Sequence, residues 1–158
     1  MAVVVTEVDS TVDTHSVVDL NGEFHFKVDN KGRVALPAKF RKVLAKDLVI
    51  TPDPLSECIY VFQTSDFNTW VNRLFVDKFG GYDEANKTHV ALRRKLKANA
   101  RDVEVDGQGR IMLNSEMRDK AGIGREVVVL GNTGRFEIWD AKRYEKVDED
   151  IDLSLFYS

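Results

Sequence analysis

A short segment that occurs twice carries the residues best suited to chemistry. Residues 28–33 read VDNKGR and residues 105–110 read VDGQGR, so in both copies an Asp precedes an Arg by four positions. An arginine can donate two parallel hydrogen bonds to guanine or to a phosphate group. The glycine before each arginine allows a tight turn that exposes backbone N–H groups. This chemistry makes Arg33 and Arg110 candidates for contact with DNA.

The other residues of the two turns are given supporting roles. A carboxylate accepts hydrogen bonds from backbone N–H groups and from a guanidinium, so Asp29 and Asp106 are predicted mainly to hold the turn. Gly32 and Gly109 are predicted to let the backbone bend there. The further predicted DNA contacts are Lys31, Lys27 and Gln108. The alternative is that the two Asp–Arg pairs only stabilise the fold.

The two turns belong to a longer internal repeat. An offset of 77 residues maps Asp29 onto Asp106 and Arg41 onto Arg118. The same offset maps residues 58–62 (CIYVF) onto residues 135–139 (RFEIW). A match that keeps its register over this length predicts two similar structural units in tandem.

Each unit is predicted to contain a strand, a turn, a second strand, a short helix and two further strands. Hydrophobic alternation, turn residues and Pro37 place these elements in the first unit. They are strands at 24–28, 34–36, 48–50 and 59–62, a turn at 30–32 and a helix at 38–45 with Phe40, Val43 and Leu44 on one side. In the second unit they are strands at 103–105, 111–113, 127–130 and 136–139, a turn at 107–109 and a helix at 115–120 that ends at Gly122.

Longer helices are expected outside these units. Thr64 or Ser65 is predicted to cap a helix whose apolar residues form one face, and Asp140 to cap the last helix. The apolar face consists of Phe67, Trp70, Val71, Leu74 and Phe75, interpreted as core or subunit interface rather than a ligand pocket. A linking helix at about 84–99 carries the basic residues Arg93, Arg94, Lys95 and Lys97. These are interpreted as a solvated face, with DNA phosphates or acids of a neighbouring subunit as alternative partners.

Composition and charge limit the classes of protein to consider. The chain has 158 residues, 43% of them hydrophobic, and a net charge of −3. Residues 1–20 and 145–158 each carry a net charge of −4, which leaves +5 for the middle of the chain. A basic centre between acidic ends is compatible with binding to nucleic acid. We hypothesise that the acidic tails discourage non-specific binding to DNA.

Several classes are not expected. No apolar run is long enough for a transmembrane helix, and no secretory signal is recognised at the start. The single cysteine, Cys58, cannot form an intrachain disulfide and agrees with a cytosolic setting. The three histidines, His15, His25 and His89, have no metal-ligand spacing. No nucleophile motif is present, so neither catalysis nor a cofactor is expected.

Two longer segments resemble a known family. DNKGRVALPAKFR, followed by a strand ending in CIYVF, is similar to the first half of MraZ proteins. DGQGRIMLNSEMR and GREVVVLGNTGRFEIW are similar to the second half, so that the resemblance covers about residues 22–145. Asn114 stands where the first copy has Pro37, which predicts a less defined start for the second short helix.

The resemblance implies an α+β fold in which two tandem pseudo-repeats form an AbrB-like swapped-hairpin, or β-barrel, domain with peripheral helices. It implies a cytoplasmic, nucleoid-associated transcriptional repressor of the division and cell-wall gene cluster. Such a protein would bind repeated short operator boxes in double-stranded DNA as a ring-shaped homo-oligomer, an octamer or a dodecamer. The alternative function is a ring-shaped assembly that binds a protein without direct DNA readout.

The predicted organisation of the chain has five parts. They are a flexible acidic arm at 1–21, a first repeat at 22–80, a linking basic helix at 81–100, a second repeat at 101–147 and an acidic tail at 148–158.

Overall fold

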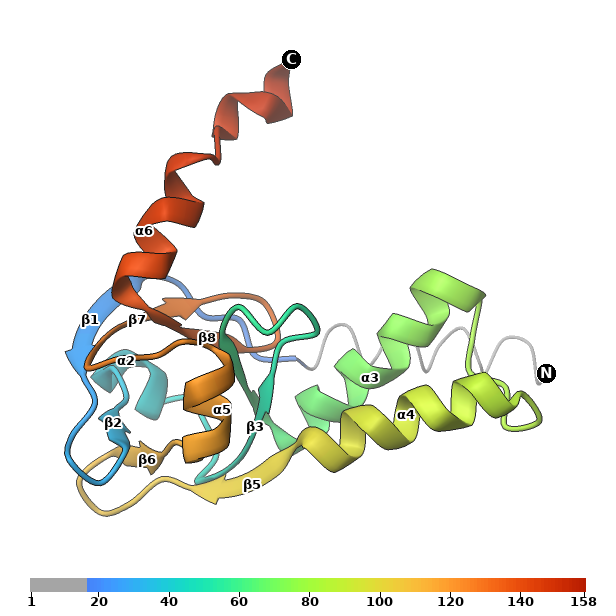
Figure 1. The fold of residues 1–158 in the computed structure, drawn as a ribbon, viewed down its shortest axis with the longest axis horizontal. Helices are drawn as coiled ribbons and strands as arrows, with labels where there is room; N and C mark the ends of the chain where they lie inside the picture. Colours follow the sequence, from blue (N-terminus) through green and yellow to red (C-terminus); the bar gives the residue numbers. More distant parts are fainter. Residues whose placement is uncertain (1–16) are drawn as a thin grey trace.

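One large sheet and one short ribbon of strands make up the β structure (Figure 1). This computed structural model describes residues 17–158. Six strands form an antiparallel sheet in the order β1-β7-β8-β4-β3-β5, and β2 pairs with β6. The strands are β1 (Glu23–Lys27), β2 (Arg33–Ala35), β3 (Asp47–Pro52), β4 (Ile59–Gln63), β5 (Arg101–Glu104), β6 (Arg110–Met112), β7 (Glu126–Gly131) and β8 (Phe136–Asp140). The helices are α2 (Ala38–Arg41), α3 (Thr64–Phe79), α4 (Lys87–Asn99), α5 (Ser115–Lys120), α6 (Ala141–Glu149) and the 3₁₀ helix η1 (Leu153–Tyr157).

The strands of the two repeats interlock. β1 belongs to the first repeat but pairs with β7 of the second, with Phe24 opposite Val129. β5 belongs to the second repeat but pairs with β3 of the first, with Leu48 opposite Val103. β2 and β6, one from each repeat, pair with each other. Each repeat therefore lends its first strand to the other, which is a swapped arrangement within an α+β fold.

The main core lies between the sheet and the β2–β6 ribbon. β2 also contacts β1, and β6 also contacts β5, so the ribbon reaches both edges of the sheet. Val34 and Ile111 enter the core from the ribbon and are almost fully buried. Phe40 of α2 packs against Phe136, with 5.5 Å between the ring centroids. The strands thus enclose an apolar interior in which both repeats take part.

A second apolar cluster lies under α3. Phe67, Val71 and Phe75 of this helix are buried against Val49 and Phe62 of the sheet. The helical spacing predicted this face, and the prediction that it is core holds for these three residues. Trp70 and Leu74, from the same predicted face, are only partly buried.

The first short helix is shorter than predicted. α2 ends at Arg41 rather than at residue 45, and Val43 is 57% exposed instead of lying beside Phe40. The chain turns away because the N–H of Ala45 donates to Oε1 of Gln63 (2.7 Å), which draws residues 42–45 toward the sheet. Gly32 allows the first turn to bend, as predicted, and takes a left-handed conformation with φ of +86°.

Helix starts also differ from the predictions in three places. Neither Thr64 nor Ser65 caps α3, because the helix follows Gln63, whose side chain binds Ala45 and Asp66 instead. α4 starts at Lys87 rather than near residue 84, because the side chain of Asn86 accepts hydrogen bonds from the N–H groups of Thr88 and His89.

α5 has a well-defined start, because the side chain of Asn114 accepts from the N–H groups of Glu116 and Met117 in the same way. The predicted cap Asp140 of α6 is present.

The chain packs against the sheet before residue 22. Residues 1–16 of the predicted arm lie outside the described residues, but residues 17–21 run along the β7–β8 turn. The N–H of Leu20 donates to the carbonyl of Asn132 (3.1 Å), and the Leu20 side chain is 5% exposed. Asp19 forms a bridge with Thr133. The prediction of a flexible segment is therefore wrong for residues 17–21.

Within residues 17–158, no helix has both the length and the apolar character that spanning a membrane would require.

Candidate nucleic-acid interface

The first turn is closed by the carboxylate of Asp29. Its Oδ1 accepts hydrogen bonds from the N–H groups of Lys31 and Arg33, both at 2.9 Å. Its Oδ2 accepts from Nε of Arg33 at 2.8 Å. The N–H of Gly32 donates to the carbonyl of Asp29, and Gly32 takes a positive φ that few other residues adopt. One carboxylate thus fixes both the turn and the arginine side chain.

The second turn reproduces this geometry. Oδ1 of Asp106 accepts from the N–H groups of Gln108 (2.9 Å) and Arg110 (3.0 Å), and Oδ2 accepts from Nε of Arg110 (2.9 Å). Gly109 has φ of +77°. Nη1 of Arg110 also lies 3.8 Å from Oδ2 of Asp29, so the two turns are in contact with each other.

Hydrogen bonding shifts the titration of both carboxyl groups. The backbone N–H of Arg33 is the main cause that lowers the pKa of Asp29 to about 2. The backbone N–H of Arg110 likewise lowers the pKa of Asp106. Hydrogen bonds to the charged form stabilise it, so both groups stay ionised at neutral pH. Each carboxylate therefore keeps a negative charge against its arginine.

The β2–β6 ribbon places both arginines on one face. Successive side chains of a strand point to opposite sides, and Arg33 pairs with Met112 while Ala35 pairs with Arg110. These four side chains lie on the outer face, whereas Val34 and Ile111 point into the core. The arginine side chains are 27% and 26% exposed. Since Asp29 and Asp106 take the Nε atoms, the terminal nitrogens carry the remaining donors for a ligand, although Nη1 of Arg110 also faces Asp29.

Two further arginines cover the glycines of the turns. A Cβ atom added to Gly109 would lie 2.7 Å from Cζ of Arg41, and one added to Gly32 would lie 2.9 Å from Nη2 of Arg118. Arg41 belongs to the first repeat and covers the turn of the second, and Arg118 does the reverse. The space above each glycine is thus used by a guanidinium from the other repeat. A side chain larger than hydrogen at either position would press on that guanidinium.

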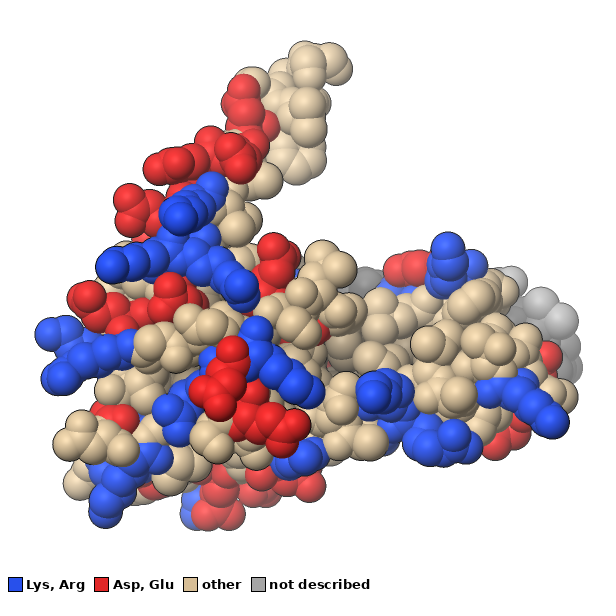
Figure 2. All heavy atoms as spheres, in the orientation of Figure 1, with Lys and Arg blue, Asp and Glu red and all other residues tan. Residues whose placement is uncertain are grey.

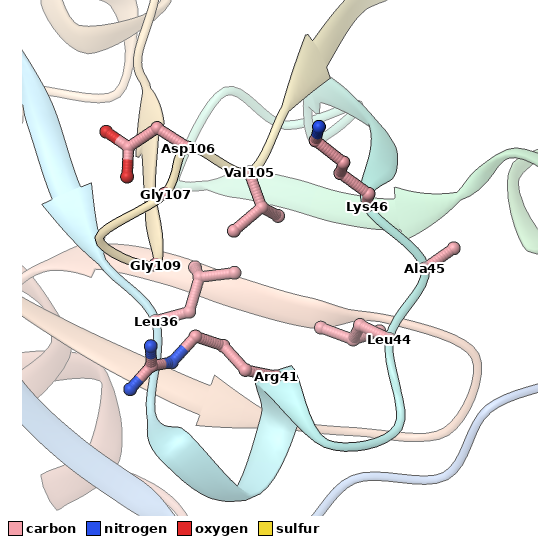
Figure 3. A pocket seen from close by; sticks show the side chains of 9 residues that line it. All are labelled: Leu36, Arg41, Leu44, Ala45, Lys46, Val105, Asp106, Gly107 and Gly109. Carbon is pink, nitrogen blue, oxygen red and sulfur yellow. The ribbon is translucent and has the colours of Figure 1, made fainter.

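A hollow of about 310 Å³ lies beside the second turn (Figure 3). Its lining includes Gly109 and Asp106 from the turn, and Arg41 and Lys46 from the first repeat. In Figure 3 the Arg41 side chain extends from α2 along Leu36, close to Gly109. The Asp106 carboxylate points away from Lys46. Arg41 therefore adds a second positive charge beside the turn that holds Arg110.

The remaining predicted contacts fall in different places. Lys31 and Gln108 are exposed at the tips of the two turns. Lys27 ends β1 and lines another hollow, together with Arg125 and Lys142. The turns thus bring Lys31 and Gln108 together with the arginines, and Lys27 lies apart from them, on the side of α6.

The basic residues of α4 are also separate from the ribbon. α3 and α4 extend together to one side of the sheet, away from β2 and β6 (Figure 1). Arg93 lies over the ring of Tyr82, 4.5 Å from its centroid. Lys97 lies over Phe67 and donates to Oδ1 of Asn68 (3.1 Å). Both side chains are therefore engaged on the α3–α4 surface itself.

Sequence reasoning missed Arg41, Arg118 and Met112 as parts of this surface. The offset of 77 residues marked the two arginines as equivalent, but their contacts join different repeats and leave no local pattern. Met112 is 46% exposed at a position in β6 where an apolar residue suggests burial. The alternation of Arg110, Ile111 and Met112 along one strand could have predicted that Met112 lies on the same outer face as Arg110.

Within residues 17–158, no group of three or more His, Cys, Asp or Glu side chains is placed to hold a metal ion. The candidate interface consists of guanidinium groups, the exposed side chains of Lys31 and Gln108, and one apolar side chain.

This fold and this surface define a class: interlocked repeats that present paired arginine turns on a two-stranded ribbon. A family model described as "MraZ protein, putative antitoxin-like" matches residues 20–85 and 96–157. The chain belongs to the MraZ family.

Curated relatives agree over most of the chain. Transcriptional regulator MraZ of Saccharopolyspora erythraea is 39% identical over 124 residues, which is 78% of this chain and 82% of the relative. The protein of the same name from Nitrosomonas eutropha is 34% identical over 128 residues, with the same shares. That of Natranaerobius thermophilus is 35% identical over 133 residues, 84% of this chain and 89% of the relative.

Proposed function

We propose that this chain is a transcriptional regulator that binds double-stranded DNA directly through the β2–β6 ribbon. The relatives described above are named transcriptional regulators, which supports the class. The finer proposal is a repressor of the division and cell-wall gene cluster, acting at repeated short operator boxes. Its place of action would be the nucleoid, in the cytoplasm.

The single observation that carries the proposal is the outer face of the ribbon. The major groove of DNA admits a two-stranded ribbon, and Arg is the side chain that most often reads guanine. Arg33 and Arg110 lie on that face with their Nε atoms already bound to Asp29 and Asp106. A guanidinium held in this way loses little freedom when its terminal nitrogens bind a base. Met112 beside them suits the methyl group of thymine.

Arg41 and Arg118 fit the same proposal as supporting charges. Each guanidinium lies over the glycine of a turn and so next to the ribbon. Contacts to phosphate position a protein on DNA but carry no sequence information. We assign Arg41 and Arg118 to phosphate contact and to support of the turns, and Arg33 and Arg110 to base readout.

Repeated boxes require several ribbons in one particle. We propose a ring-shaped homo-oligomer, an octamer or a dodecamer, in which several ribbons face successive boxes. Linking weak sites raises the overall affinity through effective concentration, provided that the spacing matches.

The test is a fluorescence-anisotropy titration with DNA from upstream of the gene that encodes this chain. Arg33→Ala with Arg110→Ala is expected to abolish specific binding, because each lost Arg–guanine pair costs about 1–3 kcal/mol. The turns should survive, since Oδ1 of each aspartate binds backbone N–H groups that the substitutions keep.

Arg93→Ala with Arg94→Ala is the matched control, because it removes the same charge from α4. It should change binding to specific and random DNA by similar small factors. Equal losses for the two double variants would contradict base readout by the ribbon.

The second candidate function is a ring that binds a protein partner. Exposed apolar residues such as Leu55 and Val76 favour a contact of that kind. Partner binding would survive the loss of Arg33 and Arg110, whereas DNA binding would not.

A further inference from the structure

The C-terminal segment, residues 150–158, exposes an unusual number of large apolar side chains. Ile151, Leu153, Leu155, Phe156 and Tyr157 are 62–95% exposed. α6 carries this segment away from the sheet, so that it projects from the body (Figure 1). Contiguous exposed apolar surface of this kind usually marks an interaction site.

The segment has its own local structure. Oδ1 of Asp152 caps the 3₁₀ helix by accepting from the N–H of Ser154 (3.0 Å), and the Asp152 carbonyl accepts from Leu155 (3.1 Å). Among the described residues, the hydrogen bonds of residues 152–158 join only members of this segment. The apolar side chains are therefore presented by an ordered segment that has no partner within the fold.

A groove elsewhere on the molecule has matching character. It has a volume of about 580 Å³ and lies between α3, α4, α5 and the β3–β4 connection. Leu74 and Phe79 of α3 and Leu92 and Leu96 of α4 line it. Phe79 is 45% and Leu92 43% exposed. The groove is thus a largely apolar surface on α3 and α4 that remains partly exposed to solvent.

The charges around the groove and the segment are opposite. Lys78, Lys95 and Lys120 lie at the groove, and of these Lys120 also lies 3.7 Å from Glu116. The one acid of the lining, Asp53, is buried, and its carboxylate accepts from the N–H of Glu57 and from Sγ of Cys58. A band of acids lies at the start of the segment and just before it, and Figure 2 shows this band below the uncharged tip. These acids are Asp148, Glu149, Asp150 and Asp152.

We infer that the C-terminal segment of one chain docks in the α3–α4 groove of a second copy of this chain. The apolar side chains of residues 151–157 fill the groove, and the acids around residue 150 face its lysines. A second copy is the occupant because α6 directs the segment away from the α3–α4 side of its own chain (Figure 1). This inference deepens the proposed ring and rests on it.

The contact has a consequence for the geometry of the assembly. The segment and the groove are different surfaces, so the contact is heterologous, and repeated rotation closes such contacts into a ring or extends them into a filament. Each chain offers one segment and one groove, so every member of a closed ring is held twice.

The experiment measures particle mass by sedimentation velocity and native mass spectrometry of the full chain. The segment variant is Leu155→Asp with Phe156→Asp, and the groove variant is Leu92→Asp. Both are expected to reduce the particle to single chains of 17.9 kDa. Val43→Asp, which changes another exposed apolar residue outside the groove, is the matched control and should leave the mass unchanged.

Mixing the two variants gives the decisive result. The segment variant keeps an intact groove and the groove variant keeps an intact segment, so the mixture should form a particle of two chains and no larger. A normal assembly in the segment variant would overturn the inference, as would a mixture that stays monomeric or an unaltered chain that is itself monomeric. Deletion of residues 1–16 provides a further test. If this deletion dissociates the particle while the segment variant stays assembled, the N-terminal residues occupy the groove and the inference fails.

The same variants separate this inference from the proposed function. A single-chain segment variant keeps its ribbon and should still bind one short DNA box in preference to random DNA, with the affinity of one site. Loss of assembly with retained binding to one box tests the docking alone. Loss of DNA binding with intact assembly, in the variant that lacks Arg33 and Arg110, tests the proposed function alone.

Discussion

In each turn, the aspartate holds the backbone and Nε of the arginine, and the terminal nitrogens of the arginine are proposed to recognise DNA. Asp29 uses Oδ1 for backbone N–H groups and Oδ2 for Nε of Arg33. The sequence alone left open whether such a pair reads DNA or holds the fold. In the structure Oδ1 holds the turn and Oδ2 holds the arginine side chain, while the terminal nitrogens of Arg33 remain at a partly exposed surface.

The low pKa of Asp29 predicts how stability depends on pH. Its pKa is about 2 in the folded chain and near the ordinary 3.8 when unfolded. A group with a depressed folded pKa contributes stability that is present above the unfolded pKa and lost as pH falls through the folded pKa. We therefore expect the free energy of unfolding to fall between about pH 4 and pH 2.

Asp29→Asn is the matching variant. It should be less stable than the parent at pH 7 and show a smaller decrease between those pH values, in urea titrations at a series of pH values. An unchanged decrease in the variant would show that other carboxyl groups cause it. Asp106, whose pKa is also lowered, is the natural second site.

Gly109 is predicted to be needed for two reasons at once. Its φ of +77° is unfavourable for other residues by about 1–2 kcal/mol, and a Cβ atom would press on Arg41. Gly109→Ala should therefore lower the free energy of unfolding by at least about 1 kcal/mol. Gly107→Ala in the same turn is the control, since a Cβ there meets nothing within 4 Å. Similar values for the two variants in urea unfolding would reject this account.

Among the elements, the two short helices show how equivalent positions reach different solutions. Pro37 precedes α2, which has four residues and no side-chain cap. Asn114 precedes α5 and accepts from two N–H groups at its start. The Asn114 cap therefore fixes the start of α5, which the sequence had predicted to be less defined without a proline.

Asn114→Ala is expected to cost about 1 kcal/mol in the free energy of unfolding, because two N–H groups lose their acceptor. Asn114→Asp should restore the cap, and Ser115→Ala, one residue further on, should change stability little. Chemical denaturation of the three variants checks this. An Asn114→Ala variant as stable as the parent would mean that packing of Met117 alone fixes the helix.

The elements that the sequence predicted well are those with local signals. Alternation located β1, turn residues located the two turns, and helical spacing located the buried face of α3. The cap of α3 was misplaced because Gln63, which precedes the helix, is held by Ala45, a residue distant in sequence. The start of α4 was misplaced although its cap is local, because Asn86 was not recognised as the capping residue. The pairing of Arg41 with Gly109 was not predictable because it joins residues of different repeats. The family resemblance, rather than any local pattern, implied the interlocked arrangement.

At the scale of the whole molecule, interlocking makes the two repeats dependent on each other. β1 needs β7 as its partner, and β5 needs β3. A fragment of residues 17–85 would leave β1 without a pairing partner, and a fragment of residues 86–158 would do the same for β5. Neither fragment should fold alone, because unpaired strands and half of the apolar core would face water.

Mixing the two fragments should restore the fold. Circular dichroism and the dispersion of amide signals in NMR spectra would rise on mixing if this prediction holds. A fragment that is folded by itself would show that one repeat can close its own sheet, contrary to the pairing described. The positive control is the folded chain cleaved between residues 85 and 86, with its two halves never separated.

The pairing of unlike residues on the ribbon also affects which DNA sequences the chain can read. Two identical halves would present the same side chains twice and would favour a palindrome. Here Lys31 corresponds to Gln108, and Ala35 to Met112, so the two ends of the ribbon differ. Since one polypeptide joins these unequal halves, a box read by this ribbon would have a direction, and all its copies should point the same way along the DNA.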